Sequence, residues 1–187
     1  MTMISCLAAM RRGFGLTVVV WALAVAAALV VPGSQAHAQS VKIVALGASN
    51  TQGKGVSPSQ AYPAHLQSML KARGVNASVM NAGINGDTTG GMLSRLDSAV
   101  PSGTQVVILQ PGGNDKRRGQ QGDRAGNISQ IKARLAARKI KVVVMENHLL
   151  QAVPPGERQP DGMHFTPAGY SRLAASILPQ VLAAIGK

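Results

Sequence analysis

A serine, a histidine and an aspartate of this chain have the types and spacing that nucleophilic catalysis requires. Asp161 and His164 stand three residues apart in the segment DGMH (161–164), so the carboxylate can orient the imidazole ring and stabilise its protonated form. The other ring nitrogen can then act as a base toward a serine hydroxyl. The candidate nucleophile is Ser49, in the segment GASNT (47–51). Taken alone, Ser49 is better explained as a turn or helix-cap serine, and His164 as a surface histidine.

Two further segments could stabilise the negative charge that develops on a carbonyl oxygen under attack. The segment NAGINGDTT (81–89) contains glycines, which allow a tight turn and an unblocked backbone N–H, although Asp87 could simply cap a following helix. The segment GGND (112–115) contains Asn114, whose side-chain amide can donate to an oxyanion. As an isolated motif, GGND would be an ordinary turn.

Four short runs of apolar, mostly β-branched residues predict strands, and four longer segments with apolar residues at helical spacing predict helices. The strands are expected at residues 41–46, 77–80, 105–109 and 140–145, and the helices at residues 59–73, 88–100, 126–139 and 167–185. This alternation is typical of a parallel α/β sheet, and uniformly apolar strands are typical of a sheet covered on both faces.

The four polar segments all follow strands of this predicted sheet. Because the carboxyl ends of parallel strands meet at one edge of the sheet, we expect the nucleophile, the oxyanion donors and the base to converge there. Such a set satisfies the requirements for acyl transfer, which none of the motifs satisfies by itself.

With these four blocks in order, the sequence from about residue 41 to residue 187 resembles the GDSL/SGNH hydrolase superfamily. Within it, the chain is similar to the bacterial periplasmic lysophospholipase, thioesterase and arylesterase group. The resemblance implies a three-layer α/β/α sandwich with a parallel, flavodoxin-like sheet of four to five strands. It also implies that no metal or organic cofactor is needed.

The resemblance assigns a role to each matching residue. It implies a triad of Ser49, Asp161 and His164, and an oxyanion hole formed by the backbone N–H groups of Ser49 and Gly86 with the side chain of Asn114. The catalytic cycle it implies passes through an acyl-enzyme on Ser49.

Three features depart from the family pattern. Ala48 stands where the family has an aspartate, and Asn50 where it has a leucine. The segment between the last predicted strand and DGMH is short, because only residues 147–160 are available for the additional helix and fifth strand that relatives often have. Either the sheet has four strands, or residues 147–150 form a minimal fifth.

The first 38 residues have the layout of a secretory signal peptide. Arg11 and Arg12 precede an apolar run at residues 16–31, and the small-residue motif AHA (36–38) follows it. The alternative is a retained membrane anchor, but the run is shorter than the roughly 20 residues that a spanning helix prefers. Cleavage after residue 38 would leave a single domain at residues 39–187 and no stable membrane anchor. It would also remove Cys6, so that cysteine catalysis is excluded.

The chain is basic, with a formal net charge of +12. Without Arg11 and Arg12, 17 basic and 7 acidic residues remain, a net charge of +10. The basic residues are dispersed and aromatic residues make up only 3% of the chain, so we expect no nucleic-acid partner.

The function expected from the sequence is therefore that of an exported, periplasmic or secreted serine esterase. Its substrate would be a small-molecule, lipid or glycan ester: a short-chain ester, a lysophospholipid or a thioester. The alternatives are an O-deacetylase of a sugar or polysaccharide, and a weakly catalytic protein that binds a glycan or lipid in the same cleft.

Overall fold

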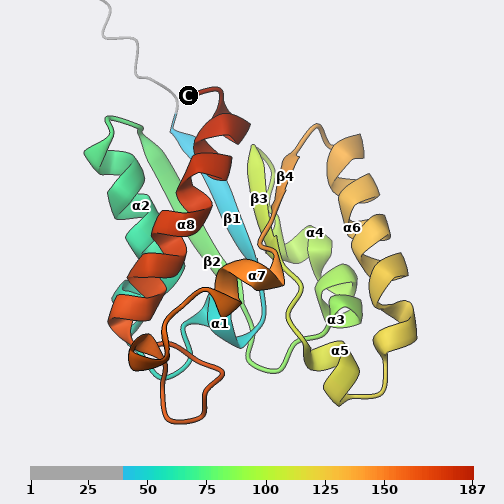
Figure 1. The fold of residues 1–187 in the computed structure, drawn as a ribbon. Helices are drawn as coiled ribbons and strands as arrows, with labels where there is room; N and C mark the ends of the chain where they lie inside the picture. The colour runs from blue at the N-terminus through green and yellow to red at the C-terminus, as the bar shows by residue number, and fades with distance from the viewer. Residues whose placement is uncertain (1–39) are drawn as a thin grey trace, which may run out of the picture. The chain divides into compact units, whose positions relative to one another are not determined.

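A parallel four-stranded sheet forms the centre of residues 40–187, the part of the chain that the computed structural model describes. Its strands are β1 (Val41–Gly47), β2 (Ala77–Gly83), β3 (Val106–Gln110) and β4 (Lys141–Val144). The strand order is β2-β1-β3-β4, and every neighbouring pair is parallel (Figure 1). The predicted α/β class is confirmed. The expected signal peptide lies outside the described residues.

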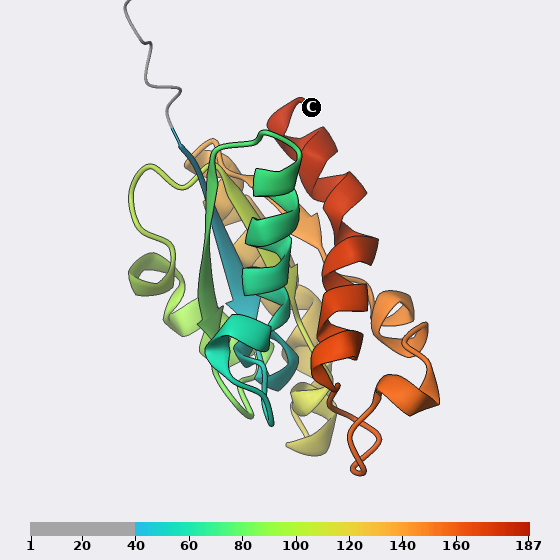
Figure 2. The same ribbon diagram turned by 90° about the vertical axis from the view of Figure 1, so that its left-hand side faces the viewer.

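Helices cover both faces of the sheet. Helices α2 (Tyr62–Ala72) and α8 (Pro167–Ile185) pack on one face, whereas α3 (Thr89–Ser94), α4 (Leu96–Ala99) and α6 (Arg124–Ala137) pack on the other. Figure 2 shows α8, in red, and α2, in teal, on one side of the sheet, with the light green helices α3 and α4 on the opposite side. These layers form the predicted three-layer sandwich.

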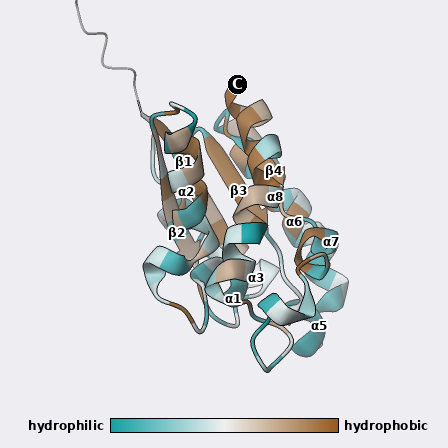
Figure 3. Cartoon of the chain, turned by 60° about the vertical axis from the view of Figure 1, so that its left-hand side comes forward, coloured by the Kyte–Doolittle hydropathy of each residue, from teal (hydrophilic) through white to brown (hydrophobic). Residues whose placement is uncertain are grey.

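Alternate residues of the central strands supply the two cores, because successive side chains of a strand point to opposite faces. Ile43 and Ala45 of β1 belong to the core beneath α2 and α8, whereas Val44 and Leu46 belong to the core beneath α3, α4 and α6. The central strands are accordingly brown in the hydropathy colouring of Figure 3, while the short polar helix α5 (Asn114–Arg117) is teal. The sheet is thus held by aliphatic packing on both sides.

The register brings three strand ends together beside the candidate nucleophile. Gly47, the last residue of β1, pairs with Gly83 on β2 and with Gln110 on β3. Helix α1 (Ser49–Gln52) begins two residues later. The loops that follow these three strands therefore start from one point at the carboxyl edge of the sheet.

Residues close in sequence determine where helix α8 begins and ends. The Thr166 side chain accepts a hydrogen bond from the backbone N–H of Gly169 at 3.3 Å, and Pro167 occupies the first turn, where its missing N–H costs no hydrogen bond. Gly186 ends the helix with a positive φ of 77°, a conformation that favours glycine. The helix spans residues 167–185, as the sequence predicts.

Three expectations about the first half of the chain differ from the structure. The helix predicted at residues 88–100 is interrupted at Arg95, where α3 ends and α4 begins. Strand β2 is not covered on both faces, because it is an edge strand with exposed positions such as Met80, which is 42% exposed. The helix predicted at residues 59–73 is divided into a 3₁₀ turn, η1 (Pro58–Gln60), and α2.

The short segment before DGMH forms no fifth strand in the described structure. Residues 147–150 belong instead to helix α7 (Asn147–Gln151), which is followed by the 3₁₀ turn η3 (Pro155–Glu157). Within residues 40–187 the sheet therefore has four strands, and β4 is its second edge. A further 3₁₀ turn, η2 (Gln121–Asp123), precedes α6. Within residues 40–187, no helix is long and apolar enough to cross a membrane.

Candidate active site

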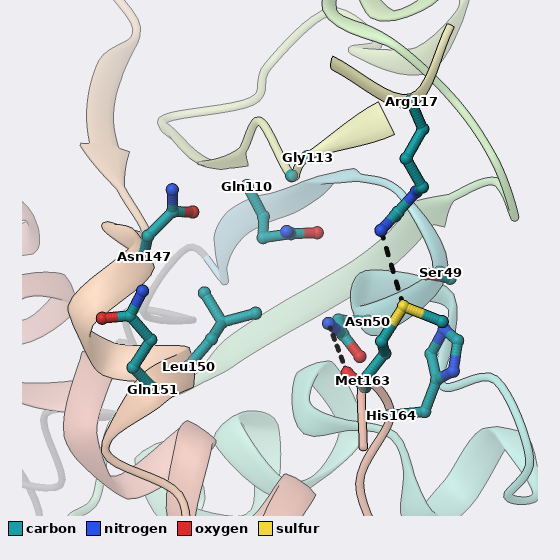
Figure 4. A pocket seen from close by; sticks show the side chains of 11 residues that line it. Ser49, Asn50, Gln110, Gly113, Arg117, Asn147, Leu150, Gln151, Met163 and His164 are labelled. Atoms are coloured by element: carbon teal, nitrogen blue, oxygen red, sulfur yellow. Dashed lines mark hydrogen bonds between the residues drawn. The ribbon is translucent and has the colours of Figure 1, made fainter. Parts of the chain in front are cut away.

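A cleft of about 300 Å³ opens at the carboxyl edge of the sheet. It is lined by residues that follow β1, by residues at the end of β3 and beyond it, by residues of α7 and by the segment before α8: Ser49, Asn50, Gln110, Gly112, Gly113, Arg117, Asn147, Leu150, Gln151, Met163 and His164 (Figure 4). The structure thus brings Ser49 and His164, which are far apart in the sequence, to one cleft. Asp161, Gly86 and Asn114 are not among the lining residues.

Ser49 lies in a loop that is packed into the molecule. We call residues 47–52 the nucleophile loop. Ser49 is the first residue of α1 and is 8% exposed. A Cβ atom at Gly83 would lie 2.1 Å from the backbone nitrogen of Gln52, so only glycine permits this approach of β2 to the loop. The position of Ser49 therefore depends on backbone-to-backbone packing.

A buried glutamine side chain braces the nucleophile loop from β3. Gln110, which is 2% exposed, accepts hydrogen bonds at its Oε1 from the Ala48 backbone N–H at 3.3 Å and from the Thr51 hydroxyl at 3.1 Å. Sequence reasoning did not identify Gln110. Its only signal was its place at the end of a strand, among otherwise apolar residues.

Arg95 ties the nucleophile loop to the segment after β2. Its Nη2 donates to the carbonyl oxygens of Gly47 and Ala82 at 3.2 and 2.9 Å, and its Nε donates to Asp87 at 2.8 Å. The side chains of Arg95 and Asp87 are largely buried, so this pair is better shielded from solvent than a surface ion pair. The same residue marks the interruption between α3 and α4.

The imidazole of His164 is paired with the carboxylate of Asp161. The distance from Nδ1 of His164 to Oδ2 of Asp161 is 2.5 Å, and Oδ1 accepts from the backbone N–H groups of Met163 and His164, both at 2.9 Å. The hydrogen bond from His164, followed by those two backbone N–H groups, holds the pKa of Asp161 well below its usual range. Asp161 therefore stays ionised at neutral and mildly acidic pH, and it leaves Nε2 of His164 available to accept a proton.

Ser49 and His164 are not joined by a hydrogen bond among the described residues, although both line the cleft. Hydrogen bonds of this kind are often long in ligand-free enzymes and tighten when a substrate binds. The arrangement can bring a hydroxyl and an imidazole to the same bound ester.

The candidate oxyanion donors come from two loops that are bonded to each other. Nδ2 of Asn114, a buried side chain, donates to the carbonyl oxygen of Asp87 at 2.7 Å. An amide nitrogen carries a second hydrogen, for which residues 40–187 supply no acceptor. The backbone N–H groups of Ser49 and Gly86 likewise donate to no described residue, and Gly86 has a positive φ of 75°. Three donors are thus unpaired near the strand ends.

A second buried carboxylate serves the packing of these loops. Asp115 accepts from the backbone N–H of Thr89 at 3.1 Å and from its hydroxyl at 2.5 Å, which ties the GGND segment to the start of α3. No group of three His, Cys, Asp or Glu side chains within residues 40–187 is placed to hold a metal ion.

The segment that carries the histidine is organised by a residue that sequence reasoning missed. We call residues 158–165 the histidine loop. Arg158 donates from Nη1 to the carbonyl oxygen of Gly162 at 3.1 Å, from Nη2 to that of Leu150 at 2.6 Å and from Nε to that of Val153 at 3.0 Å. Its guanidinium also stacks on Phe165, 5.1 Å from the ring centroid. Arg158 therefore connects the end of α7 to the histidine loop.

Asn50 connects the nucleophile loop directly to the histidine loop. Its Nδ2 donates to the carbonyl oxygen of Met163 at 3.3 Å, and the Tyr170 hydroxyl lies 3.5 Å from its Oδ1. The dashed line from Asn50 in Figure 4 marks the first of these contacts. Burial raises the pKa of Tyr170 to about 12, so its hydroxyl remains a neutral donor.

Comparison with known proteins identifies the family to which this chain belongs. Residues 45–175 match the model of the GDSL-like Lipase/Acylhydrolase family. Esterase TesA of Pseudomonas aeruginosa is 33% identical over 120 residues, which cover 63% of this chain and 59% of that protein. An arylesterase of Vibrio mimicus is 34% identical over 87 residues, which cover 46% of this chain and 44% of that protein. The chain thus spans about half the length of these relatives.

Solved structures show the same architecture. The crystal structure of TesA superimposes with a TM-score of 0.70 at 24% identity, covering 76% of this chain and 99% of that one, a likeness that shows the fold alone. AlinE4, an SGNH-hydrolase family esterase, superimposes with a TM-score of 0.54 at 32% identity, covering 77% of this chain and 71% of that one.

Proposed function

Because the chain belongs to the GDSL-like lipase/acylhydrolase family, we propose that it is an exported serine esterase that hydrolyses acyl esters through an acyl-enzyme on Ser49. The observation that carries the proposal is that Ser49 and His164 line one cleft. Nδ1 of that histidine is hydrogen-bonded to Asp161, which leaves Nε2 for the serine. The family membership agrees with the resemblance seen in the sequence.

In the proposed cycle, Nε2 of His164 takes the proton from Ser49 as the serine oxygen attacks the ester carbonyl. Asp161 stabilises the imidazolium that forms, because its carboxylate stays ionised and hydrogen-bonded to Nδ1. The alcohol leaves with the proton from His164. Water then attacks the acyl-enzyme in a second step that uses the same histidine as the base.

The negative charge on the carbonyl oxygen would be received by three donors. These are the backbone N–H groups of Ser49 and Gly86 and the second hydrogen of the Asn114 amide. All three are without an acceptor among the described residues, which supports this role. Removing one such donor typically costs about 10²–10³ in rate.

The replacement of the family aspartate by Ala48 does not leave the nucleophile loop unsupported. Gln110 accepts from the Ala48 backbone N–H and from the Thr51 hydroxyl, so a neutral side chain braces the loop in place of a carboxylate. This bracing favours an active esterase over a weakly catalytic binding protein. The leader-like residues 1–38 support export to the periplasm or beyond.

The proposal is tested by hydrolysis of p-nitrophenyl acetate, butyrate and octanoate by the purified protein and by a Ser49→Ala variant. We expect the wild type to cleave at least the short esters and the variant to lose at least about 10³-fold in kcat, because the nucleophile is absent. Ser98→Ala, at an exposed serine of α4, is the matched control. Equal rates in the wild type and Ser49→Ala would exclude the serine mechanism.

A further inference from the structure

The guanidinium of Arg117 lies at the cleft that holds Ser49 and His164. Arg117 comes from α5, and its side chain extends to Met163 of the histidine loop (Figure 4). Its Nη2 and Nε donate to Oδ1 of Asn114 at 2.6 and 3.2 Å, and its Nη1 lies 3.5 Å from the Met163 sulfur. Arg117 is an exposed residue, and its guanidinium contacts these neutral groups beside Ser49 and His164.

Arg117 forms no ion pair within residues 40–187. The acidic side chains of the neighbouring loops have other partners: Asp161 is paired with His164, Asp87 with Arg95, and Asp115 with Thr89. A guanidinium has five N–H donors, and its contacts with Asn114 and Met163 leave hydrogens of both terminal nitrogens without an acceptor. Arg117 is thus an uncompensated cation at the cleft.

The remaining side chains of the cleft are mostly amides. The amides that line it are Asn50, Gln110, Asn147 and Gln151, and among the described residues Leu150 and Met163 are its only large apolar side chains. Because Oε1 of Gln110 is engaged with the nucleophile loop, its Nε2 is left as a donor, and no described residue accepts from it. Ligand sites use a small number of placed polar groups to fix the orientation of the bound molecule. The amides and Arg117 can therefore hydrogen-bond a polar group of the substrate.

We propose that the substrate is an ester that carries a negatively charged group, and that Arg117 is the residue that binds this group. The inference rests on the proposed esterase function and narrows it from acyl esters in general to anionic ones. A planar guanidinium forms paired, charge-assisted hydrogen bonds with a carboxylate or a phosphate. The net basic charge of the chain would favour the approach of such substrates.

Arg117 has a second contact that the test must separate from substrate binding. Because it holds Oδ1 of Asn114, its loss also disturbs a proposed oxyanion donor. That disturbance would lower kcat/KM equally for neutral and anionic esters. Loss of a contact with the substrate anion would lower kcat/KM for the anionic ester alone, so the ratio of the two kcat/KM values isolates the proposed role.

The experiment measures kcat/KM for two matched pairs of esters. One pair, 4-acetoxybenzoate and its methyl ester, differs by a charge on the alcohol side. The other, mono-4-nitrophenyl adipate and 4-nitrophenyl hexanoate, differs by a charge on the acyl side. Each anionic-to-neutral ratio is compared between the wild type and Arg117→Gln, so that differences in intrinsic reactivity cancel.

We expect the ratio to fall about 10- to 100-fold in Arg117→Gln for at least one pair, the range of a hydrogen bond to a charged group. Arg117→Lys should retain part of the preference, and 0.5 M salt should weaken it. Lys116→Gln, which removes a charge from an exposed, non-lining position of α5, should leave the ratio within about threefold. Ratios unchanged by Arg117→Gln for both pairs would overturn the proposal.

Failure of the esterase function gives a different result. If no ester is hydrolysed in a Ser49-dependent way, the anion site is tested separately. Calorimetry then measures how tightly 4-acetoxybenzoate and its methyl ester bind to the Ser49→Ala variant. Preferential binding of the anion that is lost with Arg117→Gln would support the anion site without the reaction. Equal binding of both compounds would overturn it.

Discussion

The nucleophile loop and the histidine loop meet at the same cleft, but different forces hold them. The nucleophile loop is bounded by paired strand ends, a close backbone approach at Gly83 and the buried side chain of Gln110. The histidine loop lies beyond an edge strand and is held by the side chain of Arg158, by hydrogen bonds from Asn50 and Gln159, and by the buried ring of Phe165. Strand pairing and close backbone packing therefore distinguish the nucleophile loop, whereas the histidine loop depends mostly on side-chain contacts.

This difference follows from the short segment before the histidine. With four strands in the described sheet, no fifth strand lies beside β4 to carry residues 147–165. The carbonyl oxygens of that segment still need donors, because unpaired buried carbonyl groups are costly. Arg158 supplies several of them at once. Changes at the nucleophile loop should therefore affect folding, and changes at the histidine loop should mainly affect catalysis.

The largest effect is expected from Gly83→Ala, which disrupts the packing of β2 against the nucleophile loop. The added Cβ would lie 2.1 Å from the Gln52 backbone nitrogen, so the backbone must move, and we expect a loss of at least about 3 kcal/mol in the free energy of unfolding. Urea denaturation measures it. Gly126→Ala, whose Cβ meets no atom within 4 Å in helix α6, is the control and should be neutral or stabilising. Equal stabilities of the two variants would refute the packing argument.

An intermediate effect is expected from Arg158→Met, which keeps the apolar stem but removes the donors. We expect a cost of about 1–2 kcal/mol in stability and a 10- to 100-fold loss in kcat/KM, because a shift of about 1 Å in His164 is enough for such a loss. Arg172→Met, at a half-exposed arginine paired with Glu157, removes an equal charge and should change the rate little. A stability loss without a rate loss would show that the histidine loop is positioned by other contacts.

The smallest effect is expected from Asn50→Leu, which restores the leucine usual in the family and removes the contact between the loops. Losing the hydrogen bond to the Met163 carbonyl should cost less than about 1 kcal/mol and lower kcat/KM about two- to fivefold. Stopped-flow or steady-state kinetics at several temperatures would detect it. An increase in rate would mean that the contact restrains the histidine loop more than catalysis requires.

Most of the elements were predictable, because they depend on neighbours in the sequence. Helix α8 was predicted with its observed ends because Thr166, Pro167 and Gly186 act on their own turns. The interruption at Arg95 was not predictable, since its partners Gly47, Ala82 and Asp87 come from other segments. The exposure of β2 was missed because its apolar residues do not reveal that the strand lies at an edge.

The residues of the candidate site likewise fall into those that local motifs predicted and those whose roles depend on tertiary contacts. Ser49, Asn114, Asp161 and His164 were candidates from the sequence, because motifs of short span carry these residue types, and an aspartate three residues before a histidine can reach it through local geometry alone. Only the tertiary structure decided that Gln110 braces the nucleophile loop, that Arg158 organises the histidine loop and that Arg117 stands uncompensated at the cleft. The physical reason is that a long polar side chain acquires its role from the groups it meets, and those groups come from segments that only the packed sheet brings together.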